Sequence, residues 1–450
     1  MNPFALYAIV FIEGFSSLGA EIIALRRLTP NVGSSILVTA PTIGFFLLAL
    51  AAGYYSGAKV DRGYINKVTT NFLMSAGLIG GGLSLVTIDF IFAAFPALVA
   101  YLVFVLGILC PIAWLLGQTV PILTNLVAHE RAGQASGTAL FWSTIGSFAG
   151  SIIPSLILMQ FAGISWAIMA CSAALLAGVL IMSSDRSAIY SPILLFAAIA
   201  SVNMGHSPNI ETAFGQYRVD EIIASPSNGY YAKGGRVFIV NSQNASFIGN
   251  GDTPLYASYI GEIRKTLIED LALKGGEVLV LGAGGFTLSI DENRNRYTYV
   301  DIDPAIRKIA ENHFLHKEIN GDFKVDDARN YTKNTERKFD AVVVDVYSSH
   351  TSIPSHLVTK EFWASTRRIL LEDGVMIANL ILDGRLESPY SRNILATIES
   401  IYGRCSVDVL RRKAQSSNVE VVCFATSTPG DVRIYTDESN RAELDRVTPR

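Results

Sequence analysis

The sequence predicts a bundle of membrane-spanning helices over residues 1–204, followed by a soluble α/β domain. The first observation is composition: half of the 450 residues are hydrophobic and only 17% are charged, against about 25% in soluble domains. The second is distribution, because 13 of the 75 charged residues lie in residues 1–204 and 62 lie in residues 205–450. A wholly soluble enzyme and a pure membrane carrier are therefore both excluded. The net charge of −3 provides no basic field for nucleic acid.

Seven apolar stretches approach the length of about 20 residues that a helix needs to cross a bilayer. They are Phe4–Leu25, Ser35–Tyr55, Val68–Ile88, Ala97–Gln118, Thr138–Gln160, Ile164–Met182 and Ala188–Met204. Glycine, serine and alanine are frequent in them, and small residues let helix backbones approach closely in a membrane. The stretches are therefore expected to form a packed bundle.

Basic residues in the loops indicate the orientation. On one side of the bundle lie Lys59, Arg62, Lys67, Arg131 and Arg186, and on the other lie Arg26 and Arg27. The positive-inside rule puts the N-terminus and the loop at 59–67 in the cytosol. Seven crossings would then carry the α/β domain outside. We expect either that the short seventh stretch, with Pro192, does not cross, or that residues 69–127 hide an extra crossing, within a total of six to eight spans.

Two acidic residues lie within the first apolar stretch. Glu13 and Glu21 are eight residues apart, about 80° around a helix, so both can face the bundle interior. A charge at membrane depth is costly unless it has a partner. One interpretation is a cation site suited to an amine. The other is that Glu21 pairs with Arg26 or Arg27 and that Glu13 is protonated among polar neighbours.

The four cysteines show neither a CxxC motif nor metal-ligand spacing. We expect Cys110, Cys171, Cys405 and Cys423 to be reduced packing residues, and we expect no metal site. The first apolar run is too long for the core of a cleavable signal peptide.

The soluble half is expected to begin with a linker at residues 205–210 and a small antiparallel β-domain up to residue 252. Alternating apolar and polar residues predict strands at Tyr217–Ala224 and Arg236–Val240. A helix is expected at about Thr253–Leu273, with Asp252 at its N-cap and Pro254 in its first turn. It opens the α/β domain at 253–450.

A glycine-rich turn follows the next strand. The apolar run Val278–Leu281 is followed at once by Gly282, Gly284 and Gly285. A strand, a glycine turn and a helix bring backbone N–H groups and a helix N-terminus up to a ligand. Glycines also serve plain strand-to-helix packing. However, the second strand ends 20 residues later in Asp301, where a carboxylate can accept both ribose hydroxyls of an adenosine-type cofactor.

Further acids follow the next strands. Asp326 and Asp327 follow Phe323–Val325, and Asp345 ends the run 339–344, which is apolar apart from Asp340. Strands are also expected at Val375–Leu380, Ser406–Leu410 and Val419–Phe424. These repeated strand–helix units, with acids at the strand ends, predict a doubly wound sheet with its ligand crevice at the carboxyl ends of the strands. A strand-end Asp commonly caps a turn. The polar loop after Asp345, with Tyr347, Ser348 and His350, favours a functional role because it is suited to act as a lid.

Residues from about 211 to 380 resemble the spermidine synthases, the aminopropyltransferases of polyamine synthesis, and the bundle resembles the membrane-fused branch of that family. The matching pieces, in chain order, are 282–285, 300–303, 326–328, 344–345 and 359–362, with Pro354 before the last. The resemblance implies a Rossmann-like fold of the S-adenosylmethionine methyltransferase type. It also implies decarboxylated S-adenosylmethionine as the co-substrate, an amine acceptor and a homodimer.

The resemblance also implies roles for individual residues. Asp345 would position and deprotonate the amine, and Tyr256 would lie beside the acceptor. Asp301 would hold the ribose, Asp327 or its neighbour Asp326 would hold the adenine, and the glycine turn would approach the donor. A carboxylate suits this reaction because it attracts cationic partners and can accept a proton.

Several positions depart from the family pattern. Gly285 stands where the family has an Asp that holds the donor's amine, and Ser348 stands where its catalytic loop has a second acid. After Tyr256 the family's His-Glu reads Ala257-Ser258, and Gln216 is an imperfect substitute for the Tyr-Gln of its entry motif. Loss of these groups weakens the expected hold on an aminopropyl ammonium or a diamine.

Three functions therefore remain open: a membrane-bound aminopropyltransferase, a methyl- or aminocarboxypropyl-type transferase that uses intact S-adenosylmethionine, and a non-catalytic carrier or sensor. The loop 57–63 resembles one between the second and third helices of major-facilitator carriers, which favours the third function and a cytosolic loop. Because a nucleotide-derived co-substrate is scarce outside the cell, we expect a bacterial inner-membrane protein with its catalytic domain in the cytosol.

Overall fold

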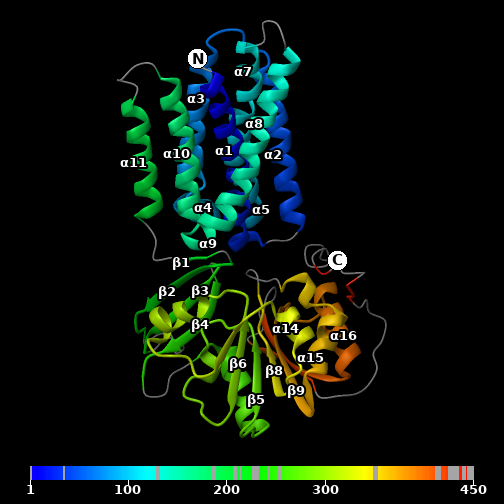
Figure 1. Ribbon diagram of the computed structural model, residues 1–450. Coiled ribbons are helices and arrows are strands. Elements are labelled where there is room, and N and C mark those ends of the chain that lie inside the picture. The colour runs from blue at the N-terminus through cyan, green and yellow to red at the C-terminus, as the bar shows by residue number, and fades with distance from the viewer. Residues whose placement is uncertain are drawn as a thin grey trace. The chain divides into compact units, whose positions relative to one another are not determined.

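The computed structural model describes residues 3–33, 36–127, 132–183, 189–205, 210–212, 214–225, 233–241, 243–251, 256–347, 353–410, 417–423, 435–437 and 442. The chain forms two compact units, Met1–Ala213 and Phe214–Arg450. Figure 1 shows helices in the first unit and mixed α/β structure in the second.

All seven predicted apolar stretches are helical. The helices are α1 (Pro3–Val32), α2 (Ile36–Gly57), α3 (Tyr64–Gly77), α4 (Leu85–Ala94), α5 (Ala97–Phe104), α6 (Cys110–Gly117), α7 (Thr119–Val127), α8 (Ala132–Ile152), α9 (Met159–Phe161), α10 (Ile164–Met182) and α11 (Tyr190–Met204). Five continuous helical segments are long and apolar enough to cross a bilayer. A sixth is a pair, 64–82 and 85–94, bent by 66°, and α11 is a shorter apolar helix.

Glycines let two of these helices touch backbone to backbone. A Cβ on Gly146 of α8 would lie 2.1 Å from the Phe11 carbonyl oxygen of α1, and a Cβ on Gly150 would lie equally close to that of Phe15. No other residue fits at this separation without moving the helices apart. The expected close packing of small residues is therefore present between α1 and α8 (Figure 1).

A buried ion pair joins the two ends of the first unit's sequence. Arg27 of α1 pairs with Glu211 in the short strand β1 (Ile210–Glu211), and both side chains are almost fully buried. The second carboxylate oxygen of Glu211 accepts the N–H groups of Ile164 (2.8 Å) and Ser165 (3.2 Å) at the start of α10. One carboxylate thus neutralises Arg27 and caps a helix. The alternative pairing of Arg27 with Glu21 is not formed.

The second unit begins with the antiparallel strands β2 (Gln216–Ile222), β3 (Gly235–Val240) and β4 (Gln243–Gly249). The first two were predicted and β4 was not. Helix α12 (Ser258–Lys265) follows, within the range expected for a helix. The proposed cap at Asp252 and Pro254 lies outside the described residues.

The main sheet has seven strands in the order β10-β11-β9-β8-β5-β6-β7. They are β5 (Glu277–Leu281), β6 (Arg296–Asp301), β7 (Asp322–Val325), β8 (Phe339–Val344), β9 (Leu370–Leu382), β10 (Cys405–Leu410) and β11 (Ser417–Cys423). Strands β5 to β9 are parallel to one another, and β11 is antiparallel to β9 and β10. This order confirms the expected methyltransferase-type fold.

Helices α14 (Ala328–Asn334), α15 (Lys360–Arg368) and α16 (Pro389–Tyr402) gather together beside the sheet (Figure 1). Phe362 and Trp363 of α15 and Ile394 of α16 are fully buried in one apolar core with the inner strands. A short helix, α13 (Ile306–Ile309), follows β6. The parallel arrangement places the ends of β5, β6 and β8 at one edge of the sheet.

The expectation that all four cysteines are reduced is wrong for two of them. Cys405 and Cys423 face each other across the antiparallel pair β10 and β11 and form a disulfide. Direct cross-strand neighbours bring their Cβ atoms close enough for this bond. Cys110 and Cys171 are free.

Candidate active site

The glycine turn after β5 lies against the end of β8. Gly282 has φ +88°, and a Cβ there would lie 2.1 Å from the carbonyl oxygen of Asp345. Only glycine fits both the backbone conformation and this contact. The Asp345 N–H donates to the Leu281 carbonyl at 2.8 Å, which continues the pairing of the two strands. The turn therefore holds Asp345 beside the loop predicted to approach a ligand.

Asp301 at the end of β6 is tied to the same turn. One carboxylate oxygen accepts the Ala283 N–H at 2.9 Å, and the other accepts the Asp303 N–H at 3.0 Å. Burial raises the pKa of Asp301, and these backbone hydrogen bonds act in the opposite direction. The structure thus brings Asp301 and Asp345 to one edge, on either side of the glycine turn.

The helix expected after the glycine turn is absent from the described segment 282–296. Gly284 at φ +50° and Phe286 at φ +57° are left-handed, and only a three-residue 3-10 turn, η7 (Thr287–Ser289), follows. The two left-handed residues interrupt the run of right-handed backbone that a helix directly after the turn would need. A helix N-terminus therefore does not point at the site, and the expectation of one is wrong.

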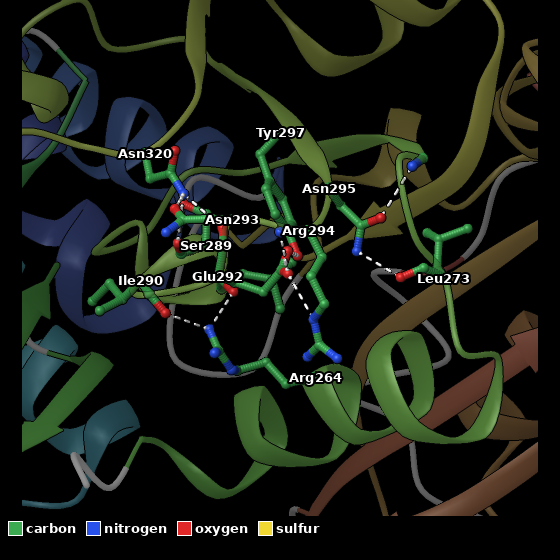
Figure 2. A network of polar contacts seen from close by, with 12 residues as sticks. Arg264, Leu273, Ser289, Ile290, Glu292, Asn293, Arg294, Asn295, Tyr297 and Asn320 are labelled. Carbon is green, nitrogen blue, oxygen red and sulfur yellow. Dashed lines mark hydrogen bonds and ion pairs between the residues drawn. The ribbon is translucent and has the colours of Figure 1, made fainter.

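A network of polar contacts, and not a helix, holds the segment between the glycine turn and β6 in place (Figure 2). Glu292 is buried and accepts hydrogen bonds from the Tyr297 hydroxyl at 2.7 Å and the Arg294 N–H at 2.8 Å. Burial acts to raise the pKa of Glu292, but these hydrogen bonds outweigh it and lower the pKa. Arg264 donates to the Leu288 and Ile290 carbonyls (2.6 and 3.0 Å), so the irregular segment is anchored to α12.

Asp345 is contacted by side chains from two other elements. Its Oδ1 accepts the Asn379 side-chain N–H of β9 at 2.8 Å. The Tyr259 hydroxyl of α12, which donates to the Ala245 carbonyl at 2.7 Å, also lies within hydrogen-bonding reach of the Asp345 carboxylate. Burial raises the pKa of Asp345 to about 6, while the two hydrogen bonds oppose the rise. At neutral pH the group is therefore mainly ionised yet basic enough to take up a proton.

Asn379 is itself held in place. Its Oδ1 accepts the Asn418 side-chain N–H of β11 at 2.9 Å, and its backbone carbonyl accepts the Tyr347 hydroxyl at 2.5 Å. Tyr347 therefore points back to β9 from the start of the predicted lid. Ser348 and His350, the other two loop residues proposed, lie outside the described residues.

The acids after β7 are partly occupied by the protein. Asp327 caps α14, with its Oδ1 accepting the N–H groups of Arg329 (2.9 Å) and Asn330 (3.0 Å). Its Oδ2 lies 3.3 Å from His356 Nε2. Asp326 lies next to Asp301, since the Asp326 N–H donates to the Asp301 carbonyl at 3.0 Å. Asp326 thus follows the strand beside the candidate ribose acid. Both acids already accept hydrogen bonds within the protein, because Asp326 Oδ1 accepts the Asp327 N–H and the Asn330 side-chain N–H, both at 2.8 Å.

The β-domain contributes Gln216 at the start of β2. Gln216 is buried, and its side-chain nitrogen has no partner among the described residues. The adjacent Tyr217 donates from its hydroxyl to Asp303 at 2.7 Å, which fixes this strand next to the turn after β6. A buried donor without a partner costs about 1–3 kcal/mol, so Gln216 is well suited to meet a ligand.

Tyr256 lies at the start of α12, with the guanidinium of Arg264 4.8 Å from its ring centre. Burial raises the pKa of Tyr256, and the Arg264 charge opposes the rise. The tyrosine whose hydroxyl reaches Asp345 is Tyr259, three residues further on. Among the described residues, groups of three or more side chains suited to hold a metal ion are absent.

Comparison with known proteins agrees with this geometry. Residues 253–411 match the spermine/spermidine synthase domain. Polyamine aminopropyltransferase 1 of Streptomyces coelicolor is 23% identical over 410 residues, which cover 82% of this chain and 74% of that protein. Residues 253–411 thus carry a spermine/spermidine synthase domain, a domain of transferases, and the resemblance seen in the sequence is confirmed.

The similarity to other polyamine aminopropyltransferases is also distant. The polyamine aminopropyltransferase of Vibrio vulnificus is 29% identical over 164 residues, 35% of this chain and 52% of that protein. That of Mycobacterium tuberculosis is 25% identical over 421 residues, 84% of this chain and 77% of that protein. The long matches include the apolar helical region as well as the α/β domain.

The structure explains one departure from the family pattern. A Cβ on Gly285 would lie 2.5 Å from the Phe314 ring and 2.8 Å from Ser246 Cβ. The Gly285 N–H donates to Ser246 Oγ at 2.9 Å. The missing acid thus reflects a closed space, because an Asp at this position would displace Phe314 and Ser246.

Three polar residues at the site were not singled out in the sequence: Tyr259, Asn379 and His356. Asn379 could have been found, because it is a polar residue in the otherwise apolar run Val375–Leu382. Tyr259 lies in α12, and nothing in the local sequence indicates that its hydroxyl reaches Asp345. Nothing local in the sequence marks His356, whose contact with Asp327 depends on the tertiary fold.

Proposed function

We propose that the α/β domain transfers an aminopropyl group from decarboxylated S-adenosylmethionine to an amine acceptor. The acceptor nitrogen would attack the propyl carbon bound to the sulfonium, the C–S bond would break, and its electron pair would stay on sulfur in methylthioadenosine. The ammonium formed would lose its proton to Asp345. The matched domain supports the reaction class, and the placement of Asp345 carries the mechanism.

On this proposal the other groups bind and align the donor. Asp301 would hold the ribose, Asp326 or Asp327 the adenine, and Gly282 and Gly284 would let the backbone approach it. Gln216 would donate its unpaired amide N–H to the donor. Tyr256, Tyr347, Ser348 and His350 would line the acceptor side. Alignment of the two reactants would supply much of the rate.

A second candidate is a transferase that uses intact S-adenosylmethionine. The observation in its favour is Gly285, where the space for an acid is filled by Phe314 and Ser246. An acid there would bind the donor's ammonium, whereas intact S-adenosylmethionine adds a carboxylate that an acid would repel. Non-catalytic binding by a carrier or sensor is the outcome left if neither donor reacts.

Calorimetry and product analysis on the full-length protein test the proposal. Tighter binding of the decarboxylated donor, and release of methylthioadenosine with putrescine, are the expected results. Asp345→Asn should abolish turnover and leave donor affinity within a few-fold. The matched control is Asp340→Asn on the same strand, whose carboxylate accepts the Glu277 N–H at 2.8 Å, away from the acceptor. Product formation by Asp345→Asn would refute the role of Asp345.

We also propose an integral membrane protein that acts as a homodimer, with its α/β domain in the cytosol. The five long apolar helices and the bent pair support six crossings, which return the chain to the side of its N-terminus. The Cys405–Cys423 disulfide counts against the cytosol, where disulfides are rare. Protease treatment of right-side-out vesicles distinguishes a cytosolic α/β domain from an external one, because a cytosolic domain would be protected from cleavage.

A further inference from the structure

We propose that the helical bundle contains a binding site for a linear polyamine, formed by Glu13 and Glu21 of α1. This site is separate from the one around Asp345, and it lies wholly within the first unit. The identity of the cation as a polyamine rests on the proposed function. The presence of a cation site rests on the bundle alone.

The two glutamates face the interior of the bundle along one stripe of α1. Glu13 is 2% exposed and Glu21 is 6% exposed. Ser17, midway between them, is also buried. Residues four apart lie on the same face of a helix, so the three side chains form a continuous polar line.

Neither glutamate has a cationic partner among the described residues. Glu13 accepts one hydrogen bond from the Ser143 hydroxyl of α8 at 2.9 Å. Glu21 has neither a hydrogen bond nor an ion pair within the described part of the bundle. Arg27, two turns beyond Glu21, is already neutralised by Glu211. Two buried carboxyl groups without a counter-charge must either take up protons or meet a cation, and a ligand with two ammonium groups would supply that cation.

A second buried polar layer lies on α3 and at the end of α6. Asn71 of α3 donates to Gln118 Oε1 at 3.1 Å, and both residues are fully buried. The neighbouring Phe72 and Ile12 of α1 both lie against Gly178 of α10, which brings this part of α3 close to the part of α1 that carries Glu13.

This layer contains polar atoms that the protein leaves unpaired. The atoms are Asn71 Oδ1, Gln118 Nε2 and Thr119 Oγ1, all buried and without a partner among the described residues. Gln118 and Thr119 lie at the break between α6 and α7, and α1 packs against both helices. Each unpaired buried polar atom costs about 1–3 kcal/mol, so a polar occupant such as a ligand or its water is expected here.

The spacing of the carboxylates selects the class of ligand. Eight residues at about 1.5 Å rise place the Glu13 and Glu21 backbones about 12 Å apart along α1. One small ion cannot bridge that distance. A flexible chain with an ammonium near each end can meet both carboxylates, with its N–H groups hydrogen bonded to them, while its methylene groups lie against the apolar wall.

Equilibrium dialysis of labelled spermidine against the full-length protein in nanodiscs tests the site. The Asp345→Asn background prevents turnover. Adding Glu13→Gln and Glu21→Gln should weaken spermidine binding to the bundle about 100-fold, so that one fewer spermidine is bound per chain at a concentration that fills the unaltered site. Ser16→Ala is the matched control: Ser16 is buried on α1 but donates to Cys171 of α10, and its loss should leave binding unchanged.

The possible outcomes separate the two proposals. An unchanged spermidine count in the double variant overturns the bundle site. Loss of one spermidine, together with absence of aminopropyl transfer in the wild type, keeps the site and refutes the proposed function. Butylamine, with one charge, should compete at least about tenfold more weakly, and equal competition would overturn binding to both carboxylates. If the double variant does not fold, Glu21→Asp keeps the charge and should retain binding, whereas Glu21→Gln alone should not.

Discussion

Replacing Asn379 with alanine removes the side-chain donor to Asp345 and should move the pH profile of the reaction. Asp345 must be ionised to accept a proton, so activity falls as the pH drops through about 6. The Asn379 N–H stabilises the ionised form at 2.8 Å. Its loss therefore raises the pKa of Asp345 and moves the acidic limb to higher pH.

The size of the shift follows from the hydrogen bond. A bond to a charged group contributes about 1.5–3 kcal/mol, and one pKa unit corresponds to about 1.36 kcal/mol. Asp345 is partly exposed, so water replaces some of the stabilisation that the Asn379 hydrogen bond provides. We therefore expect the pKa of Asp345 to rise by about one unit, which moves the acidic limb to about pH 7. At pH 6 about half of the wild type and about one-tenth of the variant would be ionised, which gives a rate about fivefold lower.

The assay is methylthioadenosine release between pH 5 and 9, analysed as kcat/KM against pH. Asn418→Ala is the matched control, because Asn418 supports Asn379 at 2.9 Å without donating to Asp345 itself. Its acidic limb should shift by less than half as much. An Asn379→Ala profile that coincides with the wild type would refute the link between Asn379 and the ionisation of Asp345.

Three stability predictions follow from packing and cross-linking. Gly285→Ala should lower the free energy of unfolding by about 1–3 kcal/mol, and with it the Tm, because the new Cβ meets an aromatic ring. Gly261→Ala on α12 is the control, because its Cβ would lie in open space and should not lower the Tm. Equal Tm values for the two variants would contradict this. Cys405→Ser should lower the free energy of unfolding, measured with denaturant, by about 3 kcal/mol, since the disulfide closes a loop of 18 residues. An unchanged denaturant midpoint would refute formation of the disulfide. Gly146→Ala should lower the Tm in detergent, because its Cβ would collide with the backbone of α1. Gly137→Ala on the same helix has free space and should leave the Tm unchanged. A lower Tm for Gly137→Ala than for Gly146→Ala would refute the close contact of α1 and α8.

The strands of the α/β domain were predictable because each inner strand is an apolar run that ends in a polar residue. Phe339–Val344 has this pattern, and it forms the central strand β8. Strand β4 escaped because Gln243–Gly249 mixes polar and apolar residues without a regular alternation and follows β3 with hardly any turn between them. Local pattern thus identifies buried strands better than edge strands.

The missing helix and the disulfide depend on information that a local reading lacks. After Gly282 the chain has two left-handed residues, and the polar stretch that follows is held by buried Glu292 through tertiary contacts. Cys405 and Cys423 are 18 residues apart in sequence, and only the register of β10 with β11 makes them neighbours. In both cases the outcome depends on how distant segments pair.

The positions of the candidate site acids follow from the sequence in outline, but their supports do not. Acids at strand ends are visible in the sequence, and Asp301 and Asp345 lie on either side of the glycine turn. The groups that contact Asp345 come from other elements, as with Asn379 from β9 and Tyr259 from α12. Sequence spacing along one segment does not contain that information.

The double duty of Glu211 limits how this protein can be divided for study. A fragment that stops at the end of α11, at Met204, would keep Arg27 in its apolar surroundings with nothing to balance its charge, and would leave the first N–H groups of α10 bare. Such a fragment should express poorly in detergent for a reason unrelated to any missing enzyme. Cutting after residue 212 instead would keep the counter-ion with the helices that need it.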